Sequence, residues 1–234
     1  MHAGRTLVVS AHLDDGILSC GEFLSASRNA TVLTVFAGMP GDVGVLTDYD
    51  RQCGFASAGQ AMHTRREEDR RALSMIGAGI AHLAFKDSQY ERLPDVEDMA
   101  QVLTGALIHP QWDTVVMPMG LFHCDHERVS DACMRVARHA LASPSKQWIL
   151  YEDVPYRRRL GVMQQRLAAL MGRGWILAPV ALETDAHGTS GSETADLKRK
   201  ALACYASQLA TLGLSHGGDQ QAPERFWSMT LNDS

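Results

Sequence analysis

Residues 10–15 read Ser-Ala-His-Leu-Asp-Asp and follow the apolar run Thr-Leu-Val-Val at residues 6–9. The apolar run predicts a buried strand, so the polar residues fall where a strand ends and a helix is about to begin. In an open α/β sheet, ligands bind at that edge. A histidine followed by two carboxylates can serve a metal ion and still leave one carboxylate free as a base.

A second cluster of the same kind lies far downstream, where residues 123–126 read His-Cys-Asp-His. It too follows a predicted strand, at residues 114–119. A catalytic zinc site takes about three protein ligands and keeps one position open for water. The two clusters together predict one mononuclear hydrolytic metal site with His12, Asp15 and His126 as ligands.

The remaining polar residues of the two clusters are candidates for proton transfer. Asp14 would accept a proton from a water molecule whose pKa the metal lowers. A protonated His123 would stabilise an oxyanion and then protonate a leaving amine, and Asp125 would orient it. The alternative is that an aspartate after a strand only caps the following helix. Two such clusters, each at a strand end, favour the metal site.

The strand and helix patterns alternate along the first two thirds of the chain, which predicts an α/β fold built on a parallel sheet. Thr64 is a candidate N-cap with Glu67 three residues on, and Ser192 is a second candidate N-cap. A long loop is expected at residues 38–63. Strands are expected at residues 5–11, 31–36, 80–85, 113–119, 148–151 and 176–182, and helices at 16–28, 64–76, 95–108, 127–141, 162–171 and 192–212.

The 234 residues are 45% apolar and carry a net charge of −5, so we expect one domain over residues 1–234 and no nucleic-acid partner. The five cysteines are widely spaced and never form a CxxC pair, which argues against a disulfide framework or a cysteine-rich zinc module. No signal-peptide pattern precedes the first strand, and no apolar run approaches the ~20 residues of a membrane span. We therefore expect a cytoplasmic protein without stable membrane insertion. A homo-oligomer is compatible with the sequence.

The two clusters also resemble the motifs of a known family. Residues 11–15, Ala-His-Leu-Asp-Asp, resemble the A-H-P-D-D motif of the LmbE-like, or GlcNAc-phosphatidylinositol de-N-acetylase, superfamily, and residues 123–126 resemble its H-P-D-H motif. Leu13 and Cys124 replace the usual prolines, which supply rigidity and no ligands. Weaker similarities occur at residues 65–73, 86–88 and 198–208, so that the resemblance covers about residues 5–210.

The resemblance implies a fold, a cofactor and a set of site residues. Members are zinc-dependent de-N-acetylases with a Rossmann-like, mostly parallel sheet flanked by helices. It implies that Zn²⁺ binds His12, Asp15 and His126 and that Asp14 is the base. It also implies that His123, supported by Asp125, is the electrostatic and acid residue. Two further residues, Arg65 and Asp87, would hold sugar hydroxyls.

The sequence thus predicts a zinc amidohydrolase that removes the acetyl group from an N-acetylglucosaminyl conjugate, with a glycopeptide or aminoglycoside intermediate of antibiotic biosynthesis as the favoured substrate. A lipid or thiol-cofactor GlcNAc precursor is the alternative, although Leu121 stands where some thiol-cofactor deacetylases carry a tyrosine. His187 and His216 lie in late loops that could contact substrate. A non-catalytic sugar- or metal-binding module also stays open. A nucleotide-binding Rossmann domain would need a glycine-rich turn after the first strand, where this chain has His-Leu-Asp-Asp-Gly.

Overall fold

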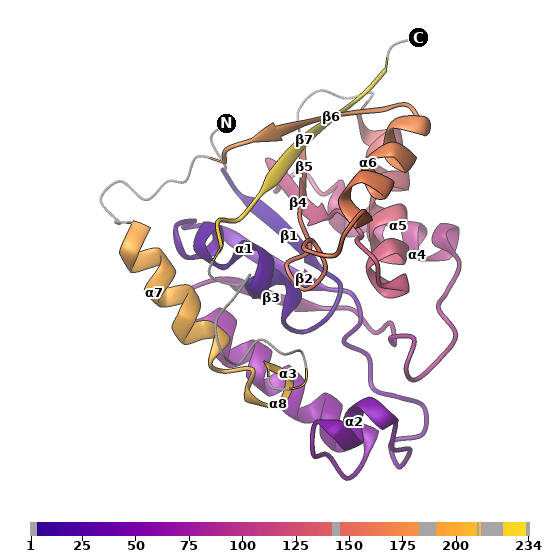
Figure 1. Cartoon of the computed structure of the whole chain (residues 1–234), viewed down its shortest axis with the longest axis vertical. Helices are drawn as coiled ribbons and strands as arrows, with labels where there is room; N and C mark the ends of the chain where they lie inside the picture. The colour runs from indigo at the N-terminus through magenta and orange to yellow at the C-terminus, as the bar shows by residue number, and fades with distance from the viewer. Residues whose placement is uncertain (1–3, 142–145, 183–190, 210, 212–221, 233–234) are drawn as a thin grey trace.

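The computed structural model describes residues 4–141, 146–182, 191–209, 211 and 222–232. Its centre is a seven-stranded sheet with the strand order β3-β2-β1-β4-β5-β7-β6 (Figure 1). The first five strands are mutually parallel, whereas β7 runs antiparallel to both β5 and β6. The strands are β1 (Thr6–Ser10), β2 (Ala30–Thr34), β3 (Gly79–His82), β4 (Thr114–Pro118), β5 (Gln147–Tyr151), β6 (Trp175–Val180) and β7 (Phe226–Leu231).

Helices cover both faces of this sheet, with α1, α3 and α7 on one side and α4, α5 and α6 on the other (Figure 1). Successive residues of a strand point to opposite faces, so Val8 packs in one apolar cluster while Leu7 and Val9 pack in the other. The predicted α/β class with a mostly parallel sheet is confirmed. The helices are α1 (Asp15–Ser25), α2 (Asp48–Gln52), α3 (Ala58–Met75), α4 (Val96–Leu107), α5 (Cys124–Ala140), α6 (Val162–Gly172), α7 (Gly191–Leu202) and α8 (Ala206–Leu209).

The segment predicted as a long loop is partly helical. It contains α2 and the first turns of α3, whose N-cap is Ser57 and not Thr64. The Ser57 side chain accepts a hydrogen bond from the backbone N–H of Gln60 at 3.2 Å. The prediction of a start at Thr64 was wrong because the first turns of α3 bury mostly small residues, Ala58 and Ala61, next to Gly59, and such residues give a weak apolar period.

The C-terminal third also differs from the prediction in two places. The helix expected over residues 192–212 ends at Leu202 in the structure, and α8 follows after a break. Ser192 lies inside α7, which begins at Gly191. Strand β7 was not predicted, and it fills the gap between β5 and β6.

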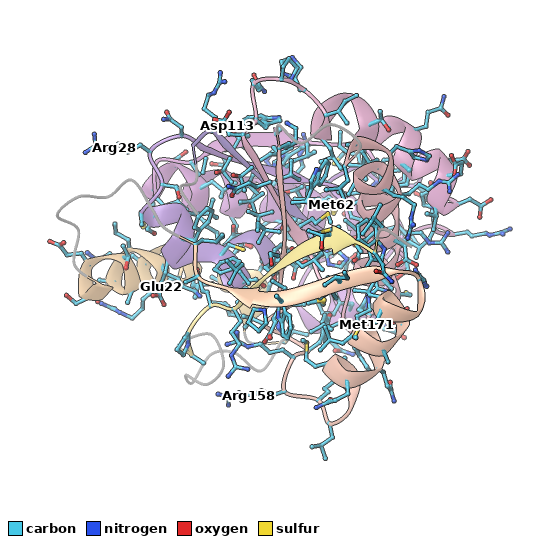
Figure 2. The ribbon with its side chains drawn as sticks, turned by 90° about the horizontal axis from the view of Figure 1, so that it is seen from above. Glu22, Arg28, Met62, Asp113, Arg158 and Met171 are labelled. Atoms are coloured by element: carbon cyan, nitrogen blue, oxygen red, sulfur yellow. The ribbon has the colours of Figure 1, made fainter. Side chains whose placement is uncertain are left out.

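The surface and the interior follow the expected division. Arg28 and Arg158 project from the periphery, whereas Met62 is 2% exposed and lies within the molecule (Figure 2). All five cysteines are free thiols. Over the described residues, no helix combines the length and apolar character needed to cross a bilayer.

The strand order places the polar clusters at one edge. Going along the chain, the sheet grows from β1 through β2 to β3, then returns to add β4 on the other side of β1. The carboxyl ends of β1 and β4 therefore flank a topological switch point, where an open α/β sheet forms a crevice. His12 follows β1 and His123 follows β4, so the fold brings both motifs to this crevice.

Candidate active site and metal centre

A cavity of about 250 Å³ opens at the carboxyl ends of β1 and β4. It joins the two motifs with segments from the rest of the chain. Seven of the eight predicted site residues line it, namely His12, Asp14, Asp15, Arg65, Asp87, His123 and Asp125. The eighth, His126, is 1% exposed and lies behind them.

The three predicted metal ligands converge around one carboxylate oxygen. Asp15 Oδ2 lies 3.1 Å from His12 Nδ1 and 3.2 Å from His126 Nε2. A donor atom from each of these residues lies within 4.8 Å of the other two. Within the described part of the chain, the buried His126 Nε2 forms no hydrogen bond. Two imidazoles and a carboxylate, with a buried ring nitrogen that faces the carboxylate, fit a divalent ion.

The electrostatics of the cluster favour a positive charge at its centre. Burial lowers the pKa of both histidines, but their carboxylate neighbours outweigh it. Asp15 raises the pKa of His126 to about 9, and Asp125 and Asp15 raise that of His12 well above its usual value. Burial opposes ionisation of Asp15, yet His126 and His12 hold its pKa well below the usual range. A metal ion competes with protons for these same nitrogens.

His12 belongs to a second candidate group as well. Its Nε2 lies 2.9 Å from Asp125 Oδ2, and donor atoms of His12, His123 and Asp125 also fall within 4.8 Å of one another. Since both groups share His12, they are alternatives for a single ion. The group with Asp15 and His126 is the more deeply buried of the two.

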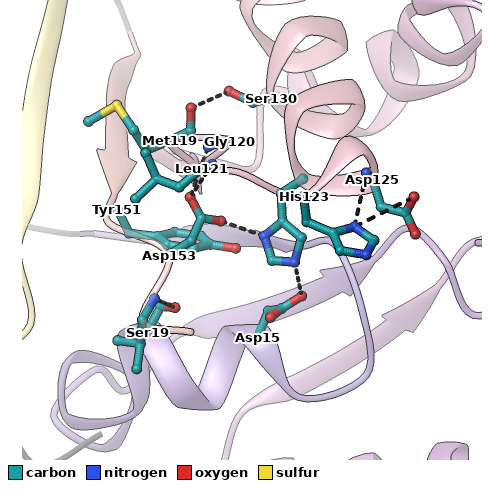
Figure 3. A network of polar contacts seen from close by, with 12 residues as sticks. Asp15, Ser19, Met119, Gly120, Leu121, His123, Asp125, Ser130, Tyr151 and Asp153 are labelled. Atoms are coloured by element: carbon teal, nitrogen blue, oxygen red, sulfur yellow. Dashed lines mark hydrogen bonds and ion pairs between the residues drawn. The ribbon is translucent and has the colours of Figure 1, made fainter. Parts of the chain in front are cut away.

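Asp153 connects the cluster to the neighbouring strand end, and the sequence reasoning did not single it out. Its Oδ1 lies 2.6 Å from His126 Nδ1, and its Oδ2 accepts the backbone N–H groups of Gly120 at 2.9 Å and Leu121 at 3.1 Å (Figure 3). Asp153 is fully buried. It therefore fixes the orientation of His126, and a partner of this kind also makes the histidine a stronger ligand.

Gly120 is required by this arrangement, and its replacement tests it. Its φ is +81°, and a Cβ there would lie 2.5 Å from the Cβ of Ser130. We expect Gly120→Ala to lower the free energy of unfolding by roughly 2–4 kcal/mol, measured by urea denaturation, because of left-handed strain and overpacking. Gly105→Ala is the matched control, since Gly105 lies in α4 with no atom within 4 Å of the added Cβ. That variant should be about 0.5–1 kcal/mol more stable than wild type. Equal effects of the two substitutions would contradict this assignment.

Asp14 lies beside the ligands without being committed to them. It occupies the N-cap position of α1 but makes no side-chain capping bond, and it is not part of either candidate metal group. Burial and the neighbouring Asp15 raise its pKa to about 7. A buried carboxylate that lines the cavity and has a pKa near neutrality is suited to take up and return a proton.

His123 and Asp125 are arranged differently from the expectation. We expected Asp125 to orient His123. Instead, Asp125 Oδ2 accepts hydrogen bonds from the His12 ring and from the backbone N–H of Ser88, the latter at 3.2 Å. His123 is the N-cap of α5, and its Nδ1 accepts the backbone N–H of Asp125 at 3.2 Å (Figure 3). Burial and the nearby His12 lower the pKa of His123. The ring is thus held neutral, with Nε2–H left for the cavity.

The two predicted sugar-binding residues both lie at the cavity. Arg65 Nη2 pairs with the fully buried Asp50 at 2.8 Å, and its guanidinium packs over the rings of Tyr49 and Phe55. The segment around α2 thus supplies the counter-ion and the aromatic wall of this arginine. Asp87 accepts both the backbone and side-chain N–H of Gln89, at 3.2 and 3.0 Å.

The sequence reasoning missed Asp50 and Asp153. Asp153 had a detectable signal, because it follows a predicted strand in the way that the motif aspartates do. Asp50 had none, since its role depends on a segment that folds back over the crevice. His187 and His216 lie outside the described residues.

Comparison with known proteins identifies the family of this chain. Residues 7–137, more than half of the chain, match the GlcNAc-PI de-N-acetylase family (PIG-L). A curated relative, 2'-N-acetylparomamine deacetylase of Streptomyces fradiae, is 29% identical over 174 residues. That alignment covers 67% of this chain and 59% of the relative, so the chain spans less than two thirds of the relative's length.

Solved structures extend the likeness of the fold to nearly the whole chain. A deacetylase of the teicoplanin biosynthesis pathway superposes with a TM-score of 0.77 at 24% identity, covering 98% of this chain and 99% of its own. The zinc-inhibited form of teicoplanin deacetylase gives a TM-score of 0.74 at 24% identity, with the same coverage of both chains. The family match, with both motifs at one crevice of this sheet, establishes that the chain belongs to the GlcNAc-PI de-N-acetylase family.

Proposed function

We propose that this protein is a metal-dependent de-N-acetylase that hydrolyses the acetamide of an N-acetylglucosaminyl conjugate. The observation that carries the proposal is the His12–Asp15–His126 cluster with the uncommitted carboxylate of Asp14 beside it, both at one cavity. Amide hydrolysis needs an activated water, a base and a group that stabilises the oxyanion. The family of the chain and its deacetylase relatives support the same reaction.

The donor set favours Zn²⁺ as the bound ion. Imidazole and carboxylate ligands in a group of three are typical of hydrolytic zinc sites. His12, Asp15 and His126 would hold the ion, which when bound would supply a Lewis acid for the activation of water and the polarisation of the amide carbonyl. The partnership of Asp153 with His126 is of the kind that supports a zinc-bound histidine.

The protein's own residues then divide the proton transfers. Asp14 accepts a proton from the attacking water while the water oxygen bonds to the amide carbon. The carbonyl oxygen becomes negatively charged and accepts a hydrogen bond from Nε2–H of the neutral His123. Asp14 then returns its proton to the nitrogen as the carbon–nitrogen bond breaks, which gives the amine and acetic acid, and the acid ionises to acetate in solution. In this assignment, His123 stabilises the oxyanion and does not need to begin the cycle protonated.

The size and lining of the cavity support a sugar substrate. At about 250 Å³ it suits one sugar ring, so the rest of the conjugate would lie outside. Arg65 and Asp87 at its wall are suited to bind hydroxyl groups. We propose an intermediate of antibiotic biosynthesis, such as a glycopeptide or aminoglycoside, because relatives named for paromamine and teicoplanin are deacetylases. A lipid or thiol-cofactor GlcNAc precursor is the competing substrate.

We further propose that the chain works as one domain in the cytoplasm. Strand β7, near the end of the described chain, lies inside the same sheet as β1 and pairs with β5. Five free thiols suit a reducing compartment.

Asp153 offers a test of the proposed metal centre. We expect Asp153→Asn to weaken zinc binding roughly 10–100-fold, the usual effect of removing a group that orients a ligand. The dissociation constant is measured by competition with a chromogenic chelator. Glu152→Gln is the control, because Glu152 accepts a hydrogen bond from Trp227 Nε1 at 3.1 Å and does not line the cavity. Equal zinc affinity in wild type and Asp153→Asn would contradict the proposed role.

Acetate release tests the function itself. Metal-free protein is assayed with 2'-N-acetylparomamine and with a glycopeptide that carries N-acetylglucosamine. Zinc is added at one molar equivalent and in excess, because a zinc-inhibited form of one relative is known. The proposal expects release with zinc and none with a chelator. Metal binding without acetate release from any of these substrates would favour the non-catalytic binding module. Preferential release from a lipid or thiol-cofactor precursor would change only the substrate.

A further inference from the structure

Tyr156 adds a phenol to the wall of the cavity. The residue follows β5 and lines the same cavity as His12 and Asp14. Its ring centroid lies 5.0 Å from that of His126 and 6.0 Å from that of His123. Among the described residues, none exchanges a hydrogen bond with its hydroxyl. A phenol beside a candidate reaction centre is therefore available to a bound molecule.

The position of the Tyr156 ring is fixed by its surroundings. Its backbone N–H donates to the carbonyl of Asp153 at 3.0 Å, so both residues share one tight turn. Its ring lies 5.6 Å from Phe122, and the guanidinium of Arg159 lies 3.8 Å from the same Phe122 ring. The turn that orients His126 through Asp153 therefore also orients Tyr156.

Phe122 itself has an uncommon backbone conformation for a bulky residue, with φ of +65°. Its side chain is 51% exposed, so core burial does not offset this strain. Instead the ring packs against Tyr156. The conformation of Phe122 thus contributes to holding the phenol at the mouth of the cavity, beside His123.

The ordinary chemistry of a phenol makes Tyr156 a hydrogen-bond donor. A tyrosine hydroxyl has a pKa of about 10, so it carries its proton at neutral pH. The group that it can serve is therefore an oxygen that gains negative charge.

We propose that Tyr156 is a catalytic residue that donates a hydrogen bond to the amide oxygen as that oxygen becomes an oxyanion, together with His123. The inference rests on the proposed de-N-acetylation. In this step the water oxygen bonds to the amide carbon, its proton passes to Asp14, and the carbonyl π electrons move onto the oxygen, which then accepts the hydrogen bond from Tyr156 O–H. The phenol keeps its proton throughout, and the Asp14 proton leaves with the amine.

This assignment also changes what the sequence suggested about the site. The motif position that carries a tyrosine in some thiol-cofactor deacetylases is Leu121 here, and Leu121 is fully buried. The phenol at this cavity instead comes from the turn after β5. The cavity therefore has a tyrosine after β5, although the position after β4 holds Leu121.

Two substitutions at the same position separate the hydroxyl from the ring. Tyr156→Phe removes only the hydroxyl, whereas Tyr156→Leu also removes the ring that packs against Phe122 and His123. We expect Tyr156→Phe to lower kcat roughly 10²-fold, in the range of one lost oxyanion donor, with KM and zinc content close to wild type. If only packing matters, Tyr156→Phe will behave as wild type and Tyr156→Leu alone will be impaired, which overturns the proposal.

A change in the acyl group and a binding measurement add independent readouts. A trifluoroacetyl amide stabilises its own oxyanion by inductive electron withdrawal, so the penalty of Tyr156→Phe should shrink on this substrate. A methylphosphonamidate analogue, which mimics the tetrahedral geometry, should bind Tyr156→Phe roughly 10²-fold more weakly by calorimetry, since analogues report transition-state contacts. An equal penalty on both substrates, or unchanged affinity for the analogue, would contradict the role.

The experiment also distinguishes this inference from the proposed function. If wild-type protein loaded with zinc releases no acetate from any acetylated glucosaminide, the proposed function fails and the role of Tyr156 falls with it. If wild type is active and Tyr156→Phe is equally active, only the role of Tyr156 is wrong.

Discussion

Replacing His126 with alanine is expected to remove most of the bound metal, while the same change at His123 leaves metal content close to one ion per chain. His126 Nε2 is buried, faces Asp15 Oδ2 at 3.2 Å and forms no hydrogen bond within the described part. His123 uses Nδ1 to cap α5 and lies at the cavity wall. Elemental analysis of dialysed protein measures the difference. The loss in His126→Ala should exceed the roughly 10–100-fold drop in affinity typical of groups that only support a ligand.

Thermal unfolding provides a second readout of the same prediction. A ligand that binds only the native state stabilises it by about 2.7 kcal/mol at a hundred times its Kd. Added zinc should therefore raise the Tm of wild type and of His123→Ala, and should leave that of His126→Ala nearly unchanged. The reverse pattern would assign the ion to the group of His12, His123 and Asp125. Unchanged metal content in both variants would exclude both groups.

The second large effect is expected from Asp14→Asn, which should lower turnover roughly 10²–10⁴-fold while the metal and the fold are retained. The amide keeps the shape of the side chain but cannot take a proton from water. Asp14 makes no side-chain capping bond in α1, so the substitution removes no hydrogen bond from the start of that helix. Turnover is measured as acetate release at saturating substrate, and metal content by elemental analysis.

Asp87→Asn is the matched control for this variant. Asp87 also lines the cavity, but both of its oxygens accept hydrogen bonds from Gln89. We expect that variant to act chiefly on KM, since the proposed role of Asp87 is to bind the sugar. Loss of metal from Asp14→Asn would make Asp14 a ligand, and full activity would mean that another group takes the proton.

The parts of the fold that local pattern controls were predictable. An apolar run followed by polar residues identified β1 and β4, and their alternation with helices predicted the parallel sheet. The hydrophobic pattern did not predict the start of α3 or the presence of β7. The first turns of α3 contain Gly59 and small alanines, which give a weak helical pattern. Strand β7 forms because β5 and β6 leave a gap that its backbone fills.

The candidate site shows the same division between local and long-range information. Spacing within each motif predicted that His12 and Asp15 act together, because residues three apart at a strand–helix junction share one turn. It did not predict that Asp125 bonds to His12, 113 positions away, instead of serving His123. That contact exists because β1 and β4 are adjacent in the sheet.

By itself, the sequence determined the α/β class, the two motifs and the eight residues predicted for the site, because strand ends and side-chain chemistry are local properties of the chain. Only the tertiary structure decided which of these residues touch, that Asp153 supports His126, and that Tyr156 reaches the cavity. These contacts join β1, β4 and β5, which lie far apart in the chain. Their adjacency results from burying both faces of the sheet under helices, and no stretch of sequence contains that information alone.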